Sequence, residues 1–299
     1  MEIRGTTTLY GIVGQPVAHS LSPLFQNWFL NQHHIDAAYL PLPVDRSTNI
    51  ARALTGLHSC GIAGLNVTVP YKELVARVVT CDSDALAIGA VNTVRRTSDG
   101  WQGCNTDHIG IQQVVIALLK STEGCEIVLF GAGGTARAVL HGCNQLGIKR
   151  IWLCNRTQQR AEELALHAER EHYQTTITPI QWQQQEVDTA CQRAALIINT
   201  TTIGLHNRDP FPFTLPPWSG ADHGAAIDAV YSDDGSTSFT TMAASHNRRT
   251  LDGLPLLIAQ GAASFYYWHQ LSIDRQQALD YICQKLQRPP STMNGWGGE

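Results

Sequence analysis

Residues 126–139 read EIVLFGAGGTARAV, and this stretch decides the fold. It opens with an apolar run typical of a buried strand and closes with a pattern typical of a helix. Gly131, Gly133 and Ala136 occupy the fixed positions of a G-x-G-x-x-G/A loop. The first glycine allows a tight turn, the second lets backbone N–H groups approach a pyrophosphate, and the helix N-terminus carries a partial positive charge. The stretch therefore predicts a dinucleotide-binding unit, with an ordinary strand-to-helix turn as the alternative.

The end of the following strand predicts which dinucleotide is bound. Ile151–Cys154 lies about 20 residues beyond the loop, where an NAD site carries an acidic residue for the ribose 2′-hydroxyl. This chain instead has Asn155, Arg156 and Thr157, with Arg160 one turn later. Guanidinium groups favour a 2′-phosphate through bidentate charge-assisted hydrogen bonds. We expect NADP(H) rather than NAD(H), although Arg160 alone is also explained as a solvated helix residue.

Short apolar runs alternate with longer segments of helical period, and no internal repeat is present. We expect strands at Leu9–Val13, Ala38–Leu40, Gly64–Val69, Glu126–Phe130, Ile151–Cys154, Leu196–Asn199 and Ala225–Val230. We expect helices at Pro23–Gln32, Arg46–Cys60, Tyr71–Val79, Thr106–Lys120, Thr135–Leu146, Gln158–Arg170, Leu254–His269 and Asp274–Gln287. The alternation predicts an α/β protein with mainly parallel strands, in which a second domain opens near Glu126.

Composition excludes several classes of protein. The chain has 299 residues, 43% of them hydrophobic and 15% charged, with a net charge of −4. These values argue against a disordered chain and against the basic footprint of a nucleic-acid binder. The first residues lack the pattern of a secretory signal, and no apolar run is long enough to span a membrane, so we expect a soluble, cytoplasmic protein.

The cysteines carry no sign of a disulfide framework or a metal site. They are scattered, without a C-x-x-C pair or a short Cys/His cluster of zinc-site spacing. The eight residues are Cys60, Cys81, Cys104, Cys125, Cys143, Cys154, Cys191 and Cys283. We expect free thiols that pack as small hydrophobic groups, and no metal.

Polar residues that suit a polyhydroxylated ligand occur before residue 110. Ser20 and Ser22 lie in a loop before Pro23, although Ser22 is also suited to capping the helix that follows. Asn66 and Thr68 share one face of an expected strand, because alternate side chains of a strand point the same way. The two serines are placed to face one polyhydroxylated ligand, and Asn66 and Thr68 form a second polar pair on their strand.

Lys72 is the candidate acid or base. Only four lysines occur, and solvation explains the other three. Pro70 ends the preceding strand, which places Lys72 in the first turn of a helix, where the helix dipole favours loss of its proton. Asp107 also lies in a first helical turn, where capping alone would explain it. A surface lysine is the alternative for Lys72, but together the two groups suit proton exchange with a hydroxyl.

In combination these motifs resemble the shikimate dehydrogenase family, in order along the chain from Gly14 to about Trp268. The motifs are the Ser20/Ser22 loop, NVTVPYK (66–72), IGAVNTV (88–94), NTD (105–107), GAGGTA (131–136), NRT (155–157) and GLPLLIAQ (253–260). The resemblance implies reversible, NADPH-dependent reduction of 3-dehydroshikimate to shikimate, a step toward chorismate and the aromatic amino acids. It also implies an N-terminal α/β substrate domain, a Rossmann-type NADP-binding domain and an active site in the cleft between them.

The resemblance also assigns roles to residues. Lys72 and Asp107 would form the catalytic pair. The substrate would be bound by Ser20, Ser22, Asn66, Thr68, Lys72, Asn92, Asp107, Tyr231 and Gln260. The cofactor would be bound by Gly131, Ala132, Gly133, Gly134, Thr135, Ala136, Asn155, Arg156, Thr157, Arg160, Thr200, Val230 and Gly253. The expected domains are residues 1–108 completed by helices at 253–288, then residues 109–252, with 289–299 as a flexible tail.

Three positions depart from the family pattern. Gln26 stands where a histidine is usual, Ser-Asp-Asp-Gly replaces a proline-containing turn after Tyr231, and Pro255 lies inside an expected helix. The last two put placement of the nicotinamide in question, but not the class of reaction. The alternatives are a quinate/shikimate dehydrogenase that uses NAD(H), an aminoshikimate dehydrogenase, and a nucleotide-binding sensor without turnover. For the assembly, the expectation is a homodimer.

Overall fold

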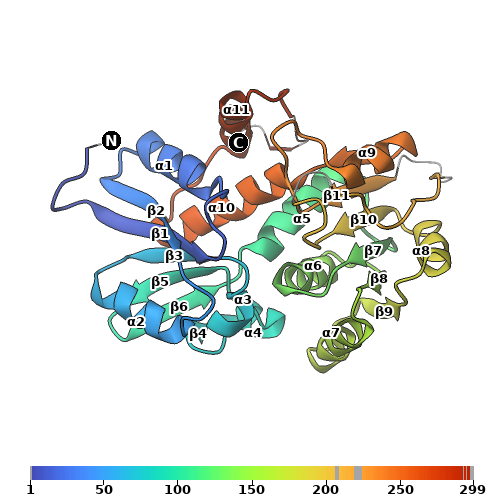
Figure 1. The fold of residues 1–299 in the computed structure, drawn as a ribbon, viewed down its shortest axis with the longest axis horizontal. Coiled ribbons are helices and arrows are strands. Elements are labelled where there is room, and N and C mark those ends of the chain that lie inside the picture. The colour runs from blue at the N-terminus through green and yellow to red at the C-terminus, as the bar shows by residue number, and fades with distance from the viewer. Residues whose placement is uncertain (1, 206–208, 219–223, 292, 294, 297–299) are drawn as a thin grey trace.

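The computed structural model describes residues 2–205, 209–218, 224–291, 293 and 295–296. Two six-stranded sheets organise it, and each lies at the centre of one lobe (Figure 1). The N-terminal lobe contains strands β1–β6 and the C-terminal lobe contains strands β7–β12. Among the described residues, no helix is both long and apolar enough to cross a membrane.

The sheet of the N-terminal lobe is mixed. Its strands are β1 (Thr8–Gly14), β2 (Ala37–Pro43), β3 (Gly64–Val67), β4 (Thr80–Cys81), β5 (Thr93–Thr97) and β6 (Gly100–Cys104), in the order β2-β1-β3-β5-β6-β4. Strand β1 runs parallel to β2 and β3, whereas β5 runs antiparallel to both β3 and β6. Most of the strand pairs in this sheet are parallel, as expected, because β4 also runs parallel to β6. The antiparallel β5 was not expected, and a tight hairpin joins it to β6 at Gly100, whose φ is +135°.

The sheet of the C-terminal lobe is parallel throughout. Its strands are β7 (Glu126–Phe130), β8 (Arg150–Cys154), β9 (Thr176–Ile180), β10 (Leu196–Asn199), β11 (Ala225–Asp228) and β12 (Arg249–Leu251). The order is β12-β11-β10-β7-β8-β9, which is that of a doubly wound, Rossmann-type sheet. The predicted α/β class with a Rossmann-type second sheet is confirmed.

Helices cover both faces of this parallel sheet. The helices of the chain are α1 (Ser22–Gln32), α2 (Ile50–Ser59), α3 (Lys72–Val75), α4 (Ser83–Ile88), α5 (Asp107–Leu118), α6 (Gly134–Gln145), α7 (Gln158–Arg170), α8 (Gln184–Cys191), α9 (Ser238–Ser245), α10 (Gly253–His269) and α11 (Arg275–Leu286). Ile127 and Leu129 of β7 pack toward α6 and α7, whereas Val128 and Phe130 pack toward α8 and α9. Strand β7 is therefore buried on both faces, as expected for a central parallel strand.

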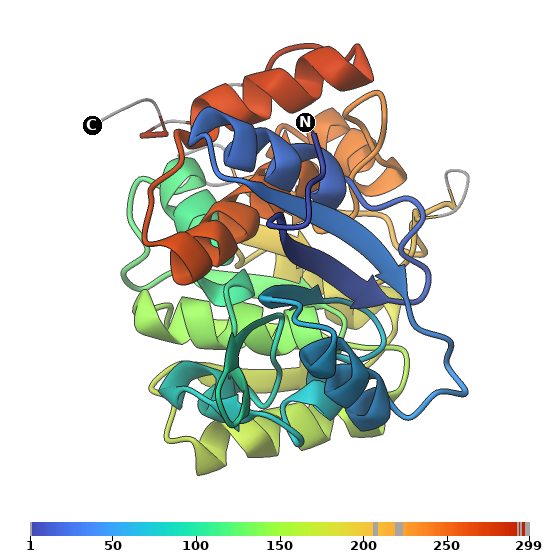
Figure 2. The same cartoon turned by 90° about the vertical axis from the view of Figure 1, so that its left-hand side faces the viewer.

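Helices α5 and α10 lie between the two sheets and pack on each other (Figure 1). Helix α10 reaches the N-terminal sheet, where Trp268 donates a hydrogen bond from Nε1 to the carbonyl of Val94 at 3.0 Å. Gln26 of α1 donates to the carbonyl of Gly261 in α10 at 2.9 Å. Helices α1, α10 and α11 thus pack together at one end of the molecule (Figure 2).

Several expected elements differ in length. The helix expected over 71–79 is only α3, and the helix expected over 46–60 begins at Ile50 because the Asn49 side chain accepts a hydrogen bond from the Ala51 amide. The strands expected to reach Val69 and Val230 end at Val67 and Asp228. The short elements β4, β5, β6, β9, β12, α4, α8 and α9 were not expected from the sequence.

The described residues near the C-terminus differ from the expected flexible tail. Met293 and Trp296 are buried, and the amide of Met293 donates to Gln276 Oε1 of α11 at 3.1 Å. The Arg275 guanidinium lies 5.6 Å from the centroid of the Trp296 ring. The eight cysteines are all free thiols, as expected.

Candidate active site

Lys72 and Asp107 form a buried ion pair between the lobes. Lys72 begins α3, Asp107 begins α5, and Lys72 Nζ lies 2.5 Å from Asp107 Oδ2. Their side chains are only 14% and 11% exposed, so water screens this pair weakly. Helix α3 has only four residues, so the expected help from its dipole is minor. The carboxylate of Asp107, rather than a helix dipole, is the main electrostatic partner of the ammonium.

Asn92 fixes the second oxygen of Asp107. Its Nδ2 donates to Asp107 Oδ1 at 2.7 Å and also lies 3.2 Å from Gln260 Oε1. Its Oδ1 accepts a hydrogen bond from the Thr106 amide at 2.7 Å. Both functions of the Asn92 amide are therefore used inside the protein, and the Asp107 carboxylate is held in one orientation.

Asn66 belongs to a neighbouring network of buried polar groups. Tyr39 Oη donates to Asn66 Oδ1 at 2.7 Å, while Asn66 Nδ2 donates to Ser264 Oγ at 2.9 Å and to Thr93 Oγ1 at 3.0 Å. Tyr39, Thr93 and Ser264 were not predicted as site residues from the sequence. Thr93 stands inside a quoted motif, whereas Ser264 is a single polar residue on a buried helix face, which periodicity alone does not distinguish from a capping or packing residue.

The loop that contains Ser20 and Ser22 is in contact with Tyr231 of the C-terminal lobe. The Ser20 hydroxyl accepts a hydrogen bond from the Ser22 amide at 3.2 Å, and Ser22 itself is buried. The residue that caps α1 is Leu21, so the suggestion that Ser22 caps the helix is wrong. Tyr231 Oη donates to the carbonyl of His19 at 3.1 Å and so joins the C-terminal lobe to the loop. Thr68 lies just past β3 and is half-buried.

The glycine loop follows β7 and starts α6. Gly131 has a φ of +108°, and a Cβ there would lie 2.6 Å from Thr200 Oγ1, so both the turn and the close approach of the strand ends require glycine. Gly133 is the N-cap residue of α6 and provides no side-chain cap, and a Cβ on it would meet nothing within 4 Å. The first amides of α6 thus face an open cradle, which is the arrangement that binds an anion.

This loop lies directly beside the ion pair. A Cβ placed on Gly134 would be 3.3 Å from Lys72 Cβ, which puts the start of α6 against the residue that begins α3. Thr135 and Ala132 are half-buried, and Ala136 is fully buried where α6 packs on the sheet. The structure therefore brings the candidate nucleotide loop of one lobe to the candidate acid or base of the other.

The remaining predicted cofactor residues lie at the carboxyl ends of neighbouring strands. Asn155, Arg156 and Thr157 follow β8, and Asn155 Nδ2 donates to the Thr157 carbonyl at 2.9 Å. Both arginines, Arg156 and Arg160, are exposed. Thr200 follows β10 and donates to the carbonyl of Phe130 at 2.7 Å. A ligand of a doubly wound sheet binds at these strand ends, beside the switch point between β7 and β10.

Val230 and Gly253 form a separate contact on the same side of the sheet. The Gly253 amide donates to the Val230 carbonyl at 2.9 Å. A Cβ on Gly253 would lie 2.3 Å from the carbonyl oxygen of Ala229, so only glycine fits. Gly253 also begins α10, whose cap is the Asp252 side chain.

Two family models match the chain. The first describes a shikimate dehydrogenase substrate binding domain and matches residues 12–94. The second describes shikimate / quinate 5-dehydrogenase and matches residues 113–203. The matched segments lie in the N-terminal and the C-terminal lobe respectively.

Known proteins match over nearly the whole chain. A shikimate dehydrogenase (NADP(+)) of Crocosphaera subtropica is 33% identical and covers 95% of this chain and 98% of its own length. The crystal structure of shikimate dehydrogenase from Aquifex aeolicus has a TM-score of 0.82 and 31% identity, with 96% and 100% coverage. The Thermus thermophilus shikimate 5-dehydrogenase in complex with NADP(H) and shikimate has a TM-score of 0.79 and 28% identity, with 94% and 100% coverage.

Proposed function

The chain belongs to the shikimate dehydrogenase family, and from that premise we infer that it is an NADP-dependent shikimate dehydrogenase. The enzyme is an oxidoreductase of the shikimate pathway that interconverts 3-dehydroshikimate and shikimate. The main structural observation in favour of this function is the buried Lys72–Asp107 pair beside the start of α6. A nucleotide-binding sensor would not need such a pair.

The residues at the strand ends fit the phosphates of NADP. The open cradle at Gly133 and the uncapped start of α6 suit a pyrophosphate. Exposed Arg156 and Arg160 suit a 2′-phosphate, and residues 155–160 include no carboxylate that would favour an unphosphorylated ribose. We assign Gly131, Gly134 and Thr200 to the walls of the cradle. When bound, the nicotinamide supplies or accepts the hydride.

Lys72 moves the proton. During reduction its ammonium donates a proton to the oxygen at position 3 of the substrate ring, and during oxidation the neutral amine takes that proton back. Asp107 holds the ammonium and accepts a hydrogen bond from the substrate hydroxyl. Because Asn92 fixes the other oxygen of Asp107, this geometry exists before the substrate arrives. The protein's contribution is thus orientation and proton transfer.

The polar groups around this pair would bind the substrate. Ser20, Thr68 and Gln260 are each only partly buried, so they retain access to a ligand. Ser22, Asn66 and Asn92 are buried, and the side chain of Tyr231 donates a hydrogen bond to the carbonyl of His19. We propose that the first group supplies new hydrogen bonds to the carboxylate and hydroxyls of shikimate, while the second holds the shape of the site.

Initial rates on the purified protein test this function. Shikimate and quinate are each measured with NADP⁺ and NAD⁺ by absorbance of the reduced nicotinamide. We expect turnover to be strongest with shikimate and NADP⁺. A preference for quinate or NAD⁺ would support the alternative specificity while keeping the reaction class. Cofactor binding without absorbance change in any combination would overturn the enzymatic function in favour of a sensor.

We also propose a cytoplasmic enzyme and keep the homodimer as a prediction. Light scattering on the same preparation tests the assembly against the chain mass of 32.8 kDa. A particle of twice that mass supports the homodimer, and a particle of the chain mass contradicts it.

A further inference from the structure

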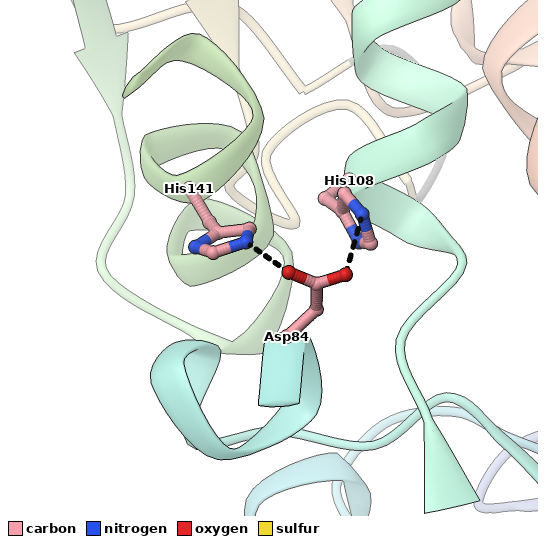
Figure 3. A group of neighbouring side chains, drawn as sticks. All are labelled: Asp84, His108 and His141. Atoms are coloured by element: carbon pink, nitrogen blue, oxygen red, sulfur yellow. Dashed lines mark hydrogen bonds and ion pairs between the residues drawn. The ribbon is translucent and has the colours of Figure 1, made fainter. Parts of the chain in front are cut away.

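Three side chains from three helices meet outside the candidate active site. Asp84 lies on α4, His108 on α5 and His141 on α6, and both imidazoles face the Asp84 carboxylate (Figure 3). His141 Nε2 lies 3.0 Å from Asp84 Oδ1, and His108 Nε2 lies 3.7 Å from Asp84 Oδ2. One candidate ligand atom from each residue lies within 4.8 Å of the other two. Asp84 is 41% exposed, whereas each histidine side chain is 8% exposed.

The hydrogen bonding of His108 leaves the lone pair of its Nε2 directed at the carboxylate of Asp84. His108 Nδ1 lies 2.5 Å from the carbonyl oxygen of Asn105, and a carbonyl only accepts, so Nδ1 carries the hydrogen. In the neutral ring, Nε2 is then an acceptor that faces the acceptor Asp84 Oδ2. Burial lowers the pKa of His108, which favours this neutral form. A cation between Nε2 and the carboxylate would satisfy both groups.

The second ring nitrogen of His141 also has a hydrogen-bond partner within the protein. Its Nδ1 lies 2.8 Å from Tyr173 Oη, which also lies 3.4 Å from the carbonyl of Ala87. Without a cation, His141 Nε2–H donates to Asp84. With a cation on Nε2, the ring carries its hydrogen on Nδ1 instead, Nδ1–H donates to Tyr173 Oη, and the tyrosine hydroxyl turns to the Ala87 carbonyl. Metal-binding histidines characteristically donate their other ring hydrogen to such a partner.

We propose that Asp84, His108 and His141 bind a divalent transition-metal ion, with Zn²⁺ as the best match. Two imidazole nitrogens and one carboxylate oxygen are established zinc ligands, and water would complete a tetrahedral set. The exposed side of Asp84 gives the ion access from solvent. Binding moves the His141 hydrogen from Nε2 to Nδ1, so the ring stays neutral and the exchange at this residue releases no net proton.

The proposed ion would link the two lobes. Helix α4 belongs to the N-terminal lobe, α6 belongs to the C-terminal lobe, and α5 runs between them (Figure 1). Without the ion, the polar links at this place include the contacts of His108 and His141 with Asp84 and a 3.3 Å hydrogen bond from Gln145 Nε2 to Asp84 Oδ1. The carbonyl of Ala87 in α4 also lies 2.7 Å from His167 Nε2 and 3.4 Å from Tyr173 Oη. An ion held from all three helices would add a ligand bond to each of them.

Metal titration of chelator-treated protein tests the site. Zn²⁺ binding is measured by calorimetry in two buffers of different ionisation enthalpy, and Co²⁺ is added separately as a spectroscopic probe. We expect one ion per chain, the same binding enthalpy in both buffers because the two neutral imidazoles release no net proton, and the intense visible bands of tetrahedral Co²⁺. In Asp84→Asn and His141→Gln, Zn²⁺ affinity should fall by more than about 100-fold, because loss of a ligand exceeds loss of an outer-shell partner.

His172→Gln is the matched control, because it removes an exposed histidine of the same lobe. It should bind Zn²⁺ as the unmodified chain does. Circular dichroism before titration establishes that each variant is folded, and Asp84→Asn conserves side-chain volume in case His141→Gln does not fold. Equal Zn²⁺ affinity in all chains, or Co²⁺ spectra without tetrahedral bands, would overturn the proposal and indicate adventitious binding only. The readouts do not involve turnover, so they stand apart from the proposed reaction.

Discussion

The ion-pair region and the ribose region differ in how their side chains are held. The ion-pair region, Lys72 with Asp107 and Asn92, is buried, and each of its charged atoms has a fixed partner. The ribose region, residues 155–160, exposes both of its arginines at the end of β8. The first arrangement suits chemistry, where an orientation must exist in advance. The second suits recognition of a charged group that arrives from solvent, at a cost of side-chain ordering.

The largest expected effect is on turnover, at Lys72. Lys72→Ala should lower kcat by about 10³- to 10⁴-fold, because it removes the proton donor while leaving the substrate groups in place. KM for shikimate should change little. Steady-state kinetics measure both constants, and Lys149→Ala, which removes an exposed lysine, should match the unmodified enzyme. A raised KM with kcat intact would reassign Lys72 to binding.

The next effect is on stability, and it compares one asparagine from each region. Asn92→Ala leaves the buried Thr106 amide and an Asp107 oxygen without a partner. At about 2 kcal/mol for each group, the free energy of unfolding should fall by roughly 4 kcal/mol. Asn155→Ala, in the ribose region, should change it by less than about 1 kcal/mol. Urea unfolding of both variants measures the difference. Equal losses of unfolding free energy would contradict the conclusion that the ion-pair region is held more firmly than the ribose region.

A buried carboxylate of the C-terminal lobe should give stability a pH dependence. Burial raises the pKa of Asp228 at the end of β11 from 3.8 to about 6. Between about pH 4 and pH 6 the folded protein therefore keeps a proton that the unfolded chain has released. By linkage, Asp228 stabilises the folded protein fully below about pH 4, and this stabilisation is lost as the pH rises through 6. The free energy of unfolding should fall by up to about 3 kcal/mol over that range.

Asp228→Asn isolates that contribution, because the amide does not ionise. The difference in unfolding free energy between the variant and the unmodified chain should move in favour of the variant as the pH rises from 4 to 7. Urea unfolding at a series of pH values provides the measurement. The slope is the readout, since the amide also alters the hydrogen bonds from Asn199 and Thr237. A constant difference across that range would show that Asp228 does not titrate there.

The smallest expected effect concerns cofactor choice, at Arg156. Arg156→Ala should raise KM for NADP⁺ by about tenfold, the loss of one charge-assisted interaction of about 1.4 kcal/mol, with kcat nearly unchanged. KM for NAD⁺ should stay the same, because it has no 2′-phosphate. Arg170→Ala, at the other end of α7, should change neither constant. An equal rise in KM for both cofactors would contradict recognition of the 2′-phosphate.

The prediction succeeded best where a motif fixes local geometry. The strand before Gly131 and the helix after it were found with nearly their observed bounds, because apolar periodicity and glycine positions are local properties. It failed for the β5–β6 hairpin and for most of the predicted helix at Tyr71. These segments are short, so their state depends on neighbours far away in the sequence rather than on a repeating pattern.

Site residues divide in the same way. Lys72 and Asp107 could be selected from their residue types and helix-start positions, and the structure places them in contact. Ser264 and Tyr39 could not, since each lies in an apolar segment that reads as core. The group of Asp84, His108 and His141 is also invisible in the sequence, because its members come from three separate helices.

The sequence by itself determined the α/β class, the glycine loop and the absence of an acidic ribose partner after β8, because each depends on residues that are near one another in the chain. Tertiary structure alone decided that Gly134 lies against Lys72, that Asn92 holds Asp107, and that α4, α5 and α6 meet. Those contacts join segments whose approach is set by the packing of whole helices and sheets. No local pattern encodes such an approach, since it minimises the free energy of the entire fold.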